Sequence, residues 1–115
     1  MPEDLFGVCP YTTAQRLLAG KWTLLILYCL SRRTMRFGEL QRELPHLTQA
    51  TLSRQLRTME ANRLIVRRVY SQIPPKVEYS LSALGEHFRP VLDALRDWGE
   101  ESIASLRREG MISPT

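Results

Sequence analysis

The chain has 115 residues, of which 43% are hydrophobic and 24% charged, with a formal net charge of +4 at pH 7. The length suits one domain with a modest core, and the composition is that of an ordinary globular protein rather than a disordered one. Its longest apolar stretch, residues 24–30, is far too short to span a bilayer. No basic-then-apolar leader opens the chain, so we expect a cytoplasmic protein with no membrane partner.

Positive charge is concentrated in one part of the chain. Residues 32–76 hold ten Lys and Arg against three Glu, a net charge of +7, and the remaining residues have a net charge of −3. Such clustering favours a phosphate-backbone partner. Nucleic acid is preferred over an anionic membrane surface, because no basic amphipathic helix of the membrane-surface type is evident.

Two helices are predicted at the start of the chain. Thr12 and Gln15 match a capping box, so the first helix is expected over residues 12–19, with Gly20 ending it. The second, residues 22–30, is apolar around most of its surface, which predicts a central buried helix.

A helix-turn-helix is predicted next. Residues 35–37 are expected to form a short strand, followed by a helix over 38–44 that Pro45 stops. Thr48 is a good N-cap for a second helix, and Asn62 is a plausible end. Apolar residues at i, i+4 and i+7 give this helix one narrow core stripe: Leu52, Leu56 and Met59.

A two-stranded hairpin follows the second helix of this motif. Residues 65–73 are rich in β-branched side chains and residues 77–81 alternate, so both are predicted strands joined by the tip 74–76. Helix, turn, helix and hairpin in this order predict a mainly α chain with a small β-hairpin wing, a winged helix-turn-helix.

A long last helix is predicted over residues 82–108, capped by Ser82 and kinked at Pro90 at a cost of ~3 kcal/mol. Its first half is expected to pack on the chain's own core. Its second half would expose an apolar patch, which a two-fold partner would bury while setting two recognition helices about one DNA turn apart. The dimer contacts predicted on this ground are Leu95, Trp98, Ile103 and Leu106.

The second helix of the motif has the composition of a DNA-reading helix. Its outer faces carry amides, hydroxyls and arginines, with no acid before Glu60. Such groups bind base edges, whereas carboxylates facing phosphate would repel it. We expect Gln49, Ala50, Ser53 and Arg54 at base edges and Thr51 and Arg57 at phosphates. The competing interpretation is a solvated polar helix face.

The hairpin tip and its surroundings add further basic residues. Lys76 is expected to contact the DNA backbone or minor groove, and Arg67 and Arg68 are weaker candidates. Arg36 and Arg42 are also weaker candidates for phosphate contacts, followed by His46. The alternative is a plain structural hairpin with solvated charges.

Short motifs spread over residues 8–99 resemble the HxlR family of bacterial and archaeal transcription regulators. They are Cys9-Pro10, Gly20-Lys21-Trp22, Arg36-Phe37-x-Glu39-Leu40, Leu52-x-x-Gln55-Leu56, Leu84-Gly85, Trp98-Gly99 and, most specific, Pro74-Pro75-Lys76-Val77-Glu78-Tyr79-Ser80-Leu81. The resemblance implies a winged helix-turn-helix homodimer that pairs through its first and last helices, binds an inverted repeat, and represses or activates nearby genes. Ala19 stands where the family often has Gly, and Ala50 replaces a commoner long polar residue, which implies a different operator.

Two kinds of switch are compatible with the sequence. Cys9 lies at or just before a helix N-terminus, which favours thiolate, and several HxlR-type regulators sense oxidants or electrophiles at the matching position. The alternative is an inert thiol, as expected for Cys29 in the core; a bridge between the two cysteines depends on geometry. A small effector between the dimer helices is the other possibility, with an apolar pocket lined by Trp22, Tyr28, Phe88 and Trp98.

Signatures of other functions are missing from the sequence. The only histidines, His46 and His87, lack partners at zinc-ligand spacing, and no Gly-rich phosphate loop or nucleophile elbow occurs. We therefore expect neither an enzyme nor a cofactor. The runner-up function is a winged-helix module for protein–protein assembly, although such modules usually lose the basic reading face.

Overall fold

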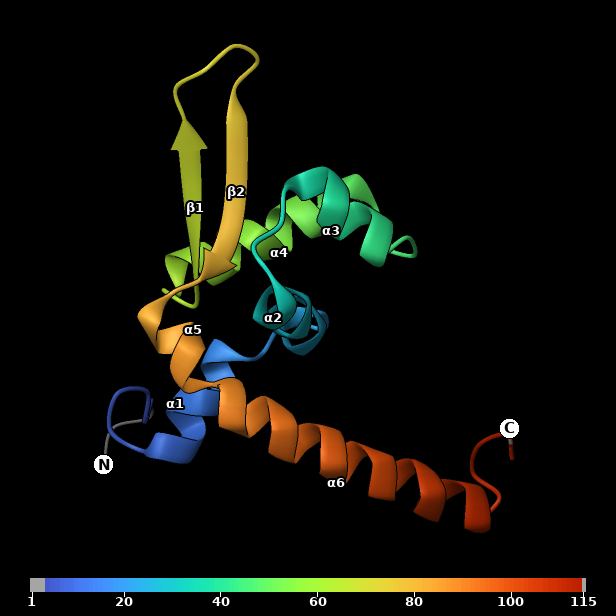
Figure 1. Ribbon diagram of the computed structural model, residues 1–115. Helices are drawn as coiled ribbons and strands as arrows, with labels where there is room; N and C mark the ends of the chain where they lie inside the picture. Colours follow the sequence, from blue (N-terminus) through green and yellow to red (C-terminus); the bar gives the residue numbers. More distant parts are fainter. Residues whose placement is uncertain (1–3, 115) are drawn as a thin grey trace.

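The computed structural model describes residues 4–114, so the first three residues, on which the expectation of no leader partly depends, lie outside it. The chain is mainly helical with one antiparallel hairpin, which confirms the predicted winged helix-turn-helix (Figure 1). Across the described residues, no helix is long and apolar enough to cross a membrane. The elements are α1 (Pro10–Leu17), α2 (Thr23–Arg32), α3 (Phe37–Glu43), α4 (Gln49–Ala61), β1 (Ile65–Tyr70), β2 (Lys76–Leu81), α5 (Ala83–His87) and α6 (Arg89–Arg108).

Helix α1 begins two residues earlier than predicted. Cys9 is the N-cap and Pro10 takes the first position of the helix, where its missing N–H costs no hydrogen bond. The capping box predicted at Thr12 is therefore wrong, and Leu18, before Gly20, is the C-cap. Thr13 instead stabilises the incoming chain, because its hydroxyl accepts a hydrogen bond of 2.8 Å from the Gly7 amide.

The core is built around α2, which lies at the centre of the molecule in Figure 1. Side chains from α3, α4 and both strands are buried with it in one core, among them Leu40, Leu52, Leu56, Met59, Ile65 and Tyr79. The predicted central position of α2 is confirmed, but the helix is buried on one side only. Leu24, Leu25 and Tyr28 remain exposed on one face, which in a single chain is an unpartnered apolar surface.

The helix-turn-helix consists of α3 and α4, and its local signals act as predicted. The Thr48 side chain caps α4 by accepting from the Thr51 amide at 3.1 Å. At the other end Asn62 is the C-cap, and Arg63 adopts a left-handed conformation with φ of 65°. The Leu64 amide then donates to the Met59 carbonyl at 3.0 Å, which completes a Schellman motif and reverses the chain into β1.

The first strand of the wing is shorter than predicted. Strand β1 ends at Tyr70 rather than at residue 73, and the register runs from Ile65 opposite Leu81 to Tyr70 opposite Lys76. Residues 71–75 form the projecting tip. The expected short strand before α3 is a single bridge, in which Met35 exchanges two backbone hydrogen bonds of 3.0 and 2.8 Å with Tyr79.

The last predicted helix is two helices. Ser82 caps α5 by accepting from the Gly85 amide at 3.0 Å, and the chain breaks at Phe88 before α6 begins. Pro90 therefore sits in the first turn of α6, where it breaks no hydrogen bond, and the predicted kink is wrong. Gly85 is needed because a Cβ there would collide with the Leu64 carbonyl.

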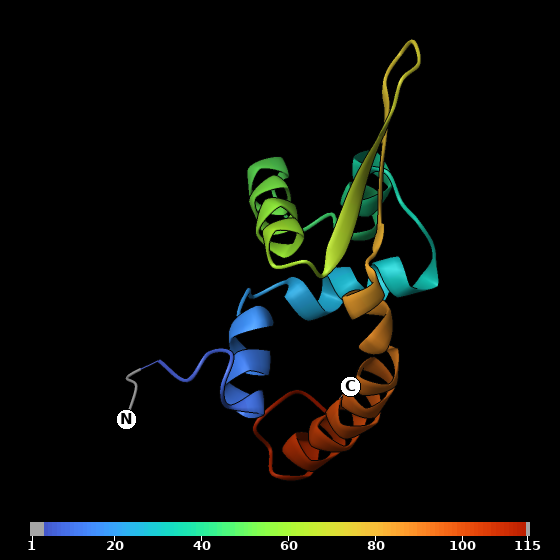
Figure 2. The same cartoon turned by 90° about the vertical axis from the view of Figure 1, so that its left-hand side faces the viewer.

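Helix α6 and the wing give the molecule an extended shape. Both views place α1 and α6 at the end opposite the wing, and α6 leaves the body (Figures 1 and 2). The Cα radius of gyration is 16.6 Å, against about 13 Å for a compact chain of this length. Much of α6 therefore has no packing partner within the chain.

Candidate nucleic-acid interface

Helix α4 turns one face to the core and leaves the other open. Leu52, Leu56 and Met59 are buried, as the sequence stripe predicted. Of the residues expected at DNA, Gln49, Ala50, Arg54 and Arg57 are exposed, whereas Thr51 and Ser53 are half-buried. The open face offers a small methyl group, an amide and two guanidinium groups.

Hydrogen bonds within α4 organise several of these groups. The Thr51 hydroxyl lies 2.9 Å from that of Thr48, so it belongs to the cap. Arg57 donates to the Ser53 hydroxyl at 2.9 Å, which orients the guanidinium along the helix. Arg54 has no such partner among the described residues. It is therefore the arginine of α4 that is most available for a base edge.

The wing carries a cluster in which positive charge is partly compensated. Lys76 Nζ lies 3.5 Å from a Glu78 carboxylate oxygen and 4.9 Å from the centre of the Tyr70 ring, and Arg68 stacks on the same ring at 5.0 Å. The Tyr70 hydroxyl, followed by the charge of Lys76, lowers the pKa of Glu78. Lys76, predicted as a phosphate contact, is thus half-buried and already paired, and Arg67 and Arg68 are the more exposed cations.

Arg36 stands at the start of α3. Its backbone amide donates to Glu39 at 2.9 Å, and the Glu39 carboxylate also accepts from Arg33 at 2.8 Å. The Arg36 amide, with Arg33 after it, lowers the pKa of Glu39. The Arg36 side chain itself is exposed. His46, by contrast, packs against Trp22 with ring centroids 4.9 Å apart.

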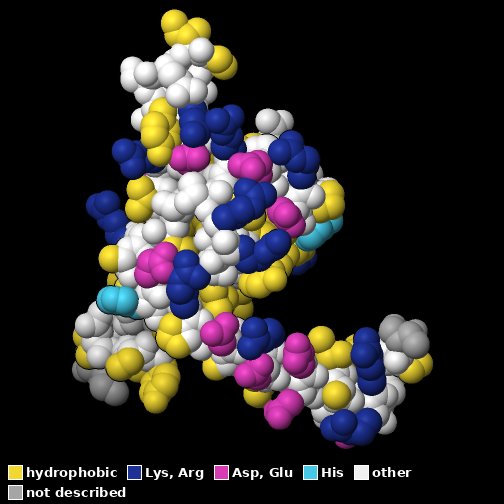
Figure 3. Space-filling model, in the orientation of Figure 1, with side chains coloured by type: hydrophobic (Ala, Val, Ile, Leu, Met, Phe, Trp, Pro, Cys, Tyr) yellow, Lys and Arg dark blue, Asp and Glu magenta, His cyan; other side chains and the backbone are white. Residues whose placement is uncertain are grey.

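Lys and Arg side chains gather over the wing and the neighbouring α3, whereas α6 carries both acidic and basic side chains (Figure 3). This distribution matches the charge segregation along the sequence, in which residues 32–76 carry the excess of positive charge. The basic surface and the projecting α6 lie at different parts of the molecule, so one can meet an anionic partner while the other packs elsewhere.

Cys9 lies at the N-terminus of α1 and is half-buried. Hydrogen bonding by the Thr12 hydroxyl and backbone N–H lowers the pKa of the Cys9 thiol. Cys29 is buried, and burial raises the pKa of its thiol. Both thiols are free. The pKa shifts of the two thiols therefore run in opposite directions.

The residues predicted at a dimer contact lie along α6 beyond its first two turns. Trp98 is 68% exposed and Ile103 44% exposed, whereas Leu95 and Leu106 are half-buried. A groove of about 670 Å³ runs between α2 and α6. It contains Trp22 and Tyr28 from the predicted effector pocket. Phe88 instead packs against the core, and Trp98 lines a separate hollow near the end of α6.

Sequence reasoning missed two sets of polar residues. Tyr70 and Glu78 contact the basic side chains of the wing. Gln55, on the inner side of α4, contacts Thr23. Both sets occur within or beside the motifs noted in the sequence, but their roles depend on neighbours from other elements. No group of three or more His, Cys, Asp or Glu side chains in residues 4–114 is placed to hold a metal ion.

The fold and this basic surface define a winged-helix transcription regulator. The chain belongs to the HxlR-like helix-turn-helix family, which matches residues 17–107. It is 43% identical over 99 residues to YdeP, an HTH-type transcriptional regulator of Bacillus subtilis (strain 168), covering 86% of this chain and 77% of YdeP. It is 42% identical over 100 residues to an HTH-type transcriptional regulator of Methanothermobacter thermautotrophicus, covering 87% and 76%.

Solved structures agree with this assignment. The redox regulator HypR in its reduced form superposes with a TM-score of 0.81 at 36% identity, over 87% of this chain and 99% of HypR. The reduced form of the transcriptional regulator YodB from B. subtilis superposes with a TM-score of 0.72 at 29% identity, over 82% and 94%. The chain is therefore a transcription regulator of helix-turn-helix type.

Proposed function

We propose that the protein is a cytoplasmic homodimer that binds an inverted-repeat DNA operator and regulates adjacent genes. The observation that carries this proposal is the open face of α4, which exposes Gln49, Ala50, Arg54 and Arg57 with no carboxylate among them. Amides and guanidinium groups bind base edges and phosphates, and a small residue lets the helix approach the groove floor. The wing and Arg36 supply contacts to the DNA backbone beside this helix.

The dimer follows from the apolar surface that a single chain leaves uncovered. Leu24, Leu25 and Tyr28 on α2 and Trp98 and Ile103 on α6 are all exposed. Apolar surface of this kind usually marks an interface. A two-fold axis near α6 would bury it and leave both wings facing the same way, so that two half-sites one DNA turn apart are read together.

A thiol switch at Cys9 is part of the proposal. Its lowered pKa and partial exposure favour reaction with oxidants or electrophiles, and the fold is shared with a protein described as a redox regulator. Because Cys9 is the N-cap of α1, a modification there would change the packing of the N-terminal helix in the dimer. Cys9→Ser is expected to abolish any response of operator affinity to oxidant. A normal response by this variant would rule out the switch.

The test of the main proposal is fluorescence-anisotropy binding to the DNA upstream of the protein's own gene, over a series of salt concentrations, with a scrambled duplex as control. Tight binding that weakens steeply with salt and prefers the native duplex is expected. Equal, weak binding to both duplexes, repeated over other candidate operators, would instead favour the winged-helix surface as a site for a protein partner.

A further inference from the structure

The turn between α1 and α2 is packed directly against the inner side of α4. Thr23, the first residue of α2, is only 3% exposed, and its hydroxyl donates to the side-chain carbonyl of Gln55 at 3.3 Å. The Thr23 amide donates to the Gly20 carbonyl at 3.2 Å, which closes the turn. Gln55 therefore connects α4 to the start of α2 on the side away from the open face.

Gly20 favours this contact, because it has no side chain in the space that Gln55 occupies. A Cβ at Gly20 would lie 2.5 and 2.7 Å from the Oε1 and Nε2 atoms of Gln55 and would also collide with the Thr23 hydroxyl. The side-chain amide of Gln55 thus occupies the space that a side chain at residue 20 would take. Such close approach packs the turn tightly against α4.

A second contact joins the same turn to the residues before α4. The Trp22 ring packs against His46, with ring centroids 4.9 Å apart and an interplanar angle of 59°. His46 belongs to the connection between α3 and α4. The turn from Gly20 to Thr23 is therefore in contact with α4 at its middle and with the loop that leads into it.

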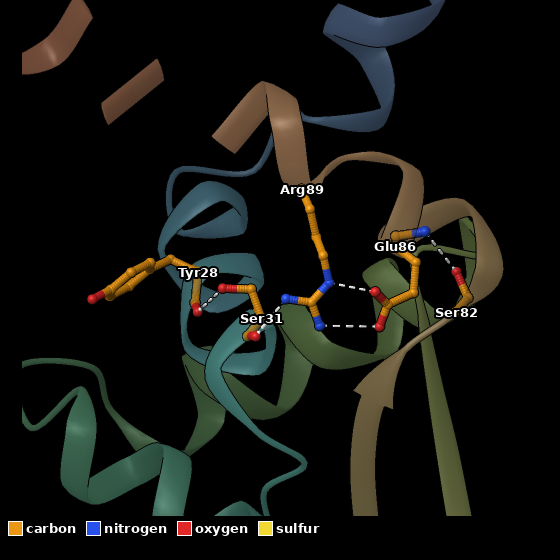
Figure 4. A network of polar contacts seen from close by, with 6 residues as sticks. Tyr28, Ser31, Ser82, Glu86 and Arg89 are labelled. Atoms are coloured by element: carbon orange, nitrogen blue, oxygen red, sulfur yellow. Dashed lines mark hydrogen bonds and ion pairs between the residues drawn. The ribbon is translucent and has the colours of Figure 1, made fainter. Parts of the chain in front are cut away.

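The other end of α2 is joined to α6. Arg89, the first residue of α6, donates to the Ser31 carbonyl at 2.7 Å and pairs with Glu86 of α5 (Figure 4). Ser31 lies in the last turn of α2. Helix α2 is thus held by α4 at its N-terminal end and by α6 at its C-terminal end, and it connects the reading helix to the helix proposed for the dimer.

We infer that Gly20, Thr23 and Gln55 are positioning residues that determine which spacing of operator half-sites the dimer accepts. This inference depends on the proposed dimeric, DNA-binding function. In a two-fold dimer built on α2 and α6, the distance between the two α4 helices follows from how each α4 is held relative to α2 and α6. The contact of Gln55 with the α1–α2 turn determines how α4 is held, and therefore determines this distance.

The test compares operators that keep the same half-sites but have spacers shortened by one base pair or lengthened by one or two. Wild-type protein is expected to show a sharp optimum. Gln55→Leu and Thr23→Val remove the hydrogen bond with little change of volume, and each is expected to reduce the preference for the optimal spacing by about tenfold, the equilibrium equivalent of one hydrogen bond. Affinity for a duplex with a single half-site should stay within about twofold, because the open face of α4 is unchanged.

Two controls separate positioning from folding. Thr23→Ser keeps the hydroxyl and should keep the wild-type spacing profile, as should Thr58→Val, which alters an exposed hydroxyl of α4. Thermal unfolding of each variant shows that it is folded, and the Thr23 pair suffices if Gln55→Leu does not fold. An unchanged optimum and preference in both Thr23→Val and Gln55→Leu would overturn the inference while leaving the proposed function intact. A wild-type protein that prefers no operator and no spacing would overturn both.

Discussion

Arg54 is the arginine of α4 whose side chain is both exposed and free of a hydrogen-bond partner among the described residues. If it forms the predicted bidentate contact with a guanine, Arg54→Ala will remove about 1–3 kcal/mol of discrimination at one base position and relax specificity there. Anisotropy titrations with single-base operator variants measure this. Arg36→Ala is the control, because loss of a phosphate contact should weaken all duplexes alike and lower the salt slope by about one. Equal losses on operator and scrambled DNA for Arg54→Ala would contradict the assignment.

Cys9 offers a prediction about pH. The Thr12 hydroxyl and amide lower the pKa of the Cys9 thiol, so the reactive thiolate persists to lower pH than in an ordinary cysteine. Iodoacetamide labelling followed by mass spectrometry across pH should place the reactivity midpoint of Cys9 below that of a free thiol. Thr12→Val should raise this midpoint, and buried Cys29 should stay unmodified in the folded protein. A Cys9 midpoint at or above that of glutathione would refute the argument.

At the scale of elements, the end of α4 carries a local strain. Arg63 adopts a φ of 65°, a conformation that glycine adopts without the steric cost paid by other residues. Arg63→Gly is therefore expected to raise the free energy of unfolding by up to about 1 kcal/mol. Urea unfolding in the absence of DNA measures the change. Arg67→Gly, a substitution of another exposed arginine within β1, should instead lower stability.

At the junction between the wing and α5, adding a methyl group is expected to lower stability. A Cβ at Gly85 would collide with the Leu64 carbonyl and stand 3.3 Å from Leu81, so Gly85→Ala should cost about 1–3 kcal/mol of stability. Gly38→Ala is the matched control, because the nearest atom to its Cβ is a flexible Arg42 nitrogen at 3.8 Å. That variant should be neutral or slightly stabilising. Similar melting temperatures for the two variants would show that the junction relaxes freely.

At the scale of the whole molecule, the extended shape and the exposed apolar side chains of α6 favour association. Trp98→Glu places a charge in the proposed interface and should weaken the dimer by about 2 kcal/mol or more, as expected for a buried aromatic anchor. Analytical ultracentrifugation over a range of concentrations measures this effect. Val69→Asp, on the exposed surface of the wing, should leave the mass unchanged. A wild-type protein that sediments as a monomer at all concentrations would exclude the dimer.

Elements with strong local signals were predicted well from the sequence. The Thr48 cap, the stripe of Leu52, Leu56 and Met59, and the end of α4 at Asn62 all depend on neighbours within one or two turns. Errors arose where two local signals competed. Pro10 took the helix start that Thr12 also offered, and the chain broke at Phe88, so that Pro90 began a helix instead of interrupting one.

The candidate site was predicted in part for the same reason. Exposure of Gln49, Ala50, Arg54 and Arg57 follows from the helical period, because these positions lie away from the core stripe. The pairing of Lys76 with Glu78 and Tyr70 did not follow, since it depends on strand register across the hairpin. The role of Gln55 depends on Gly20 and Thr23, more than thirty positions away along the chain.

By itself, the sequence determined the class of this protein: the order of its elements, the basic stretch from residue 32 to 76, and the face of α4 that avoids acids. These properties depend on periodicity and composition, which are local. Only the tertiary structure decided which cations remain free, which face of α2 is left uncovered, and how α4 is held against the turn that leads from α1. These properties arise from contacts between distant segments, where one methyl group or one hydrogen bond determines how closely two elements approach.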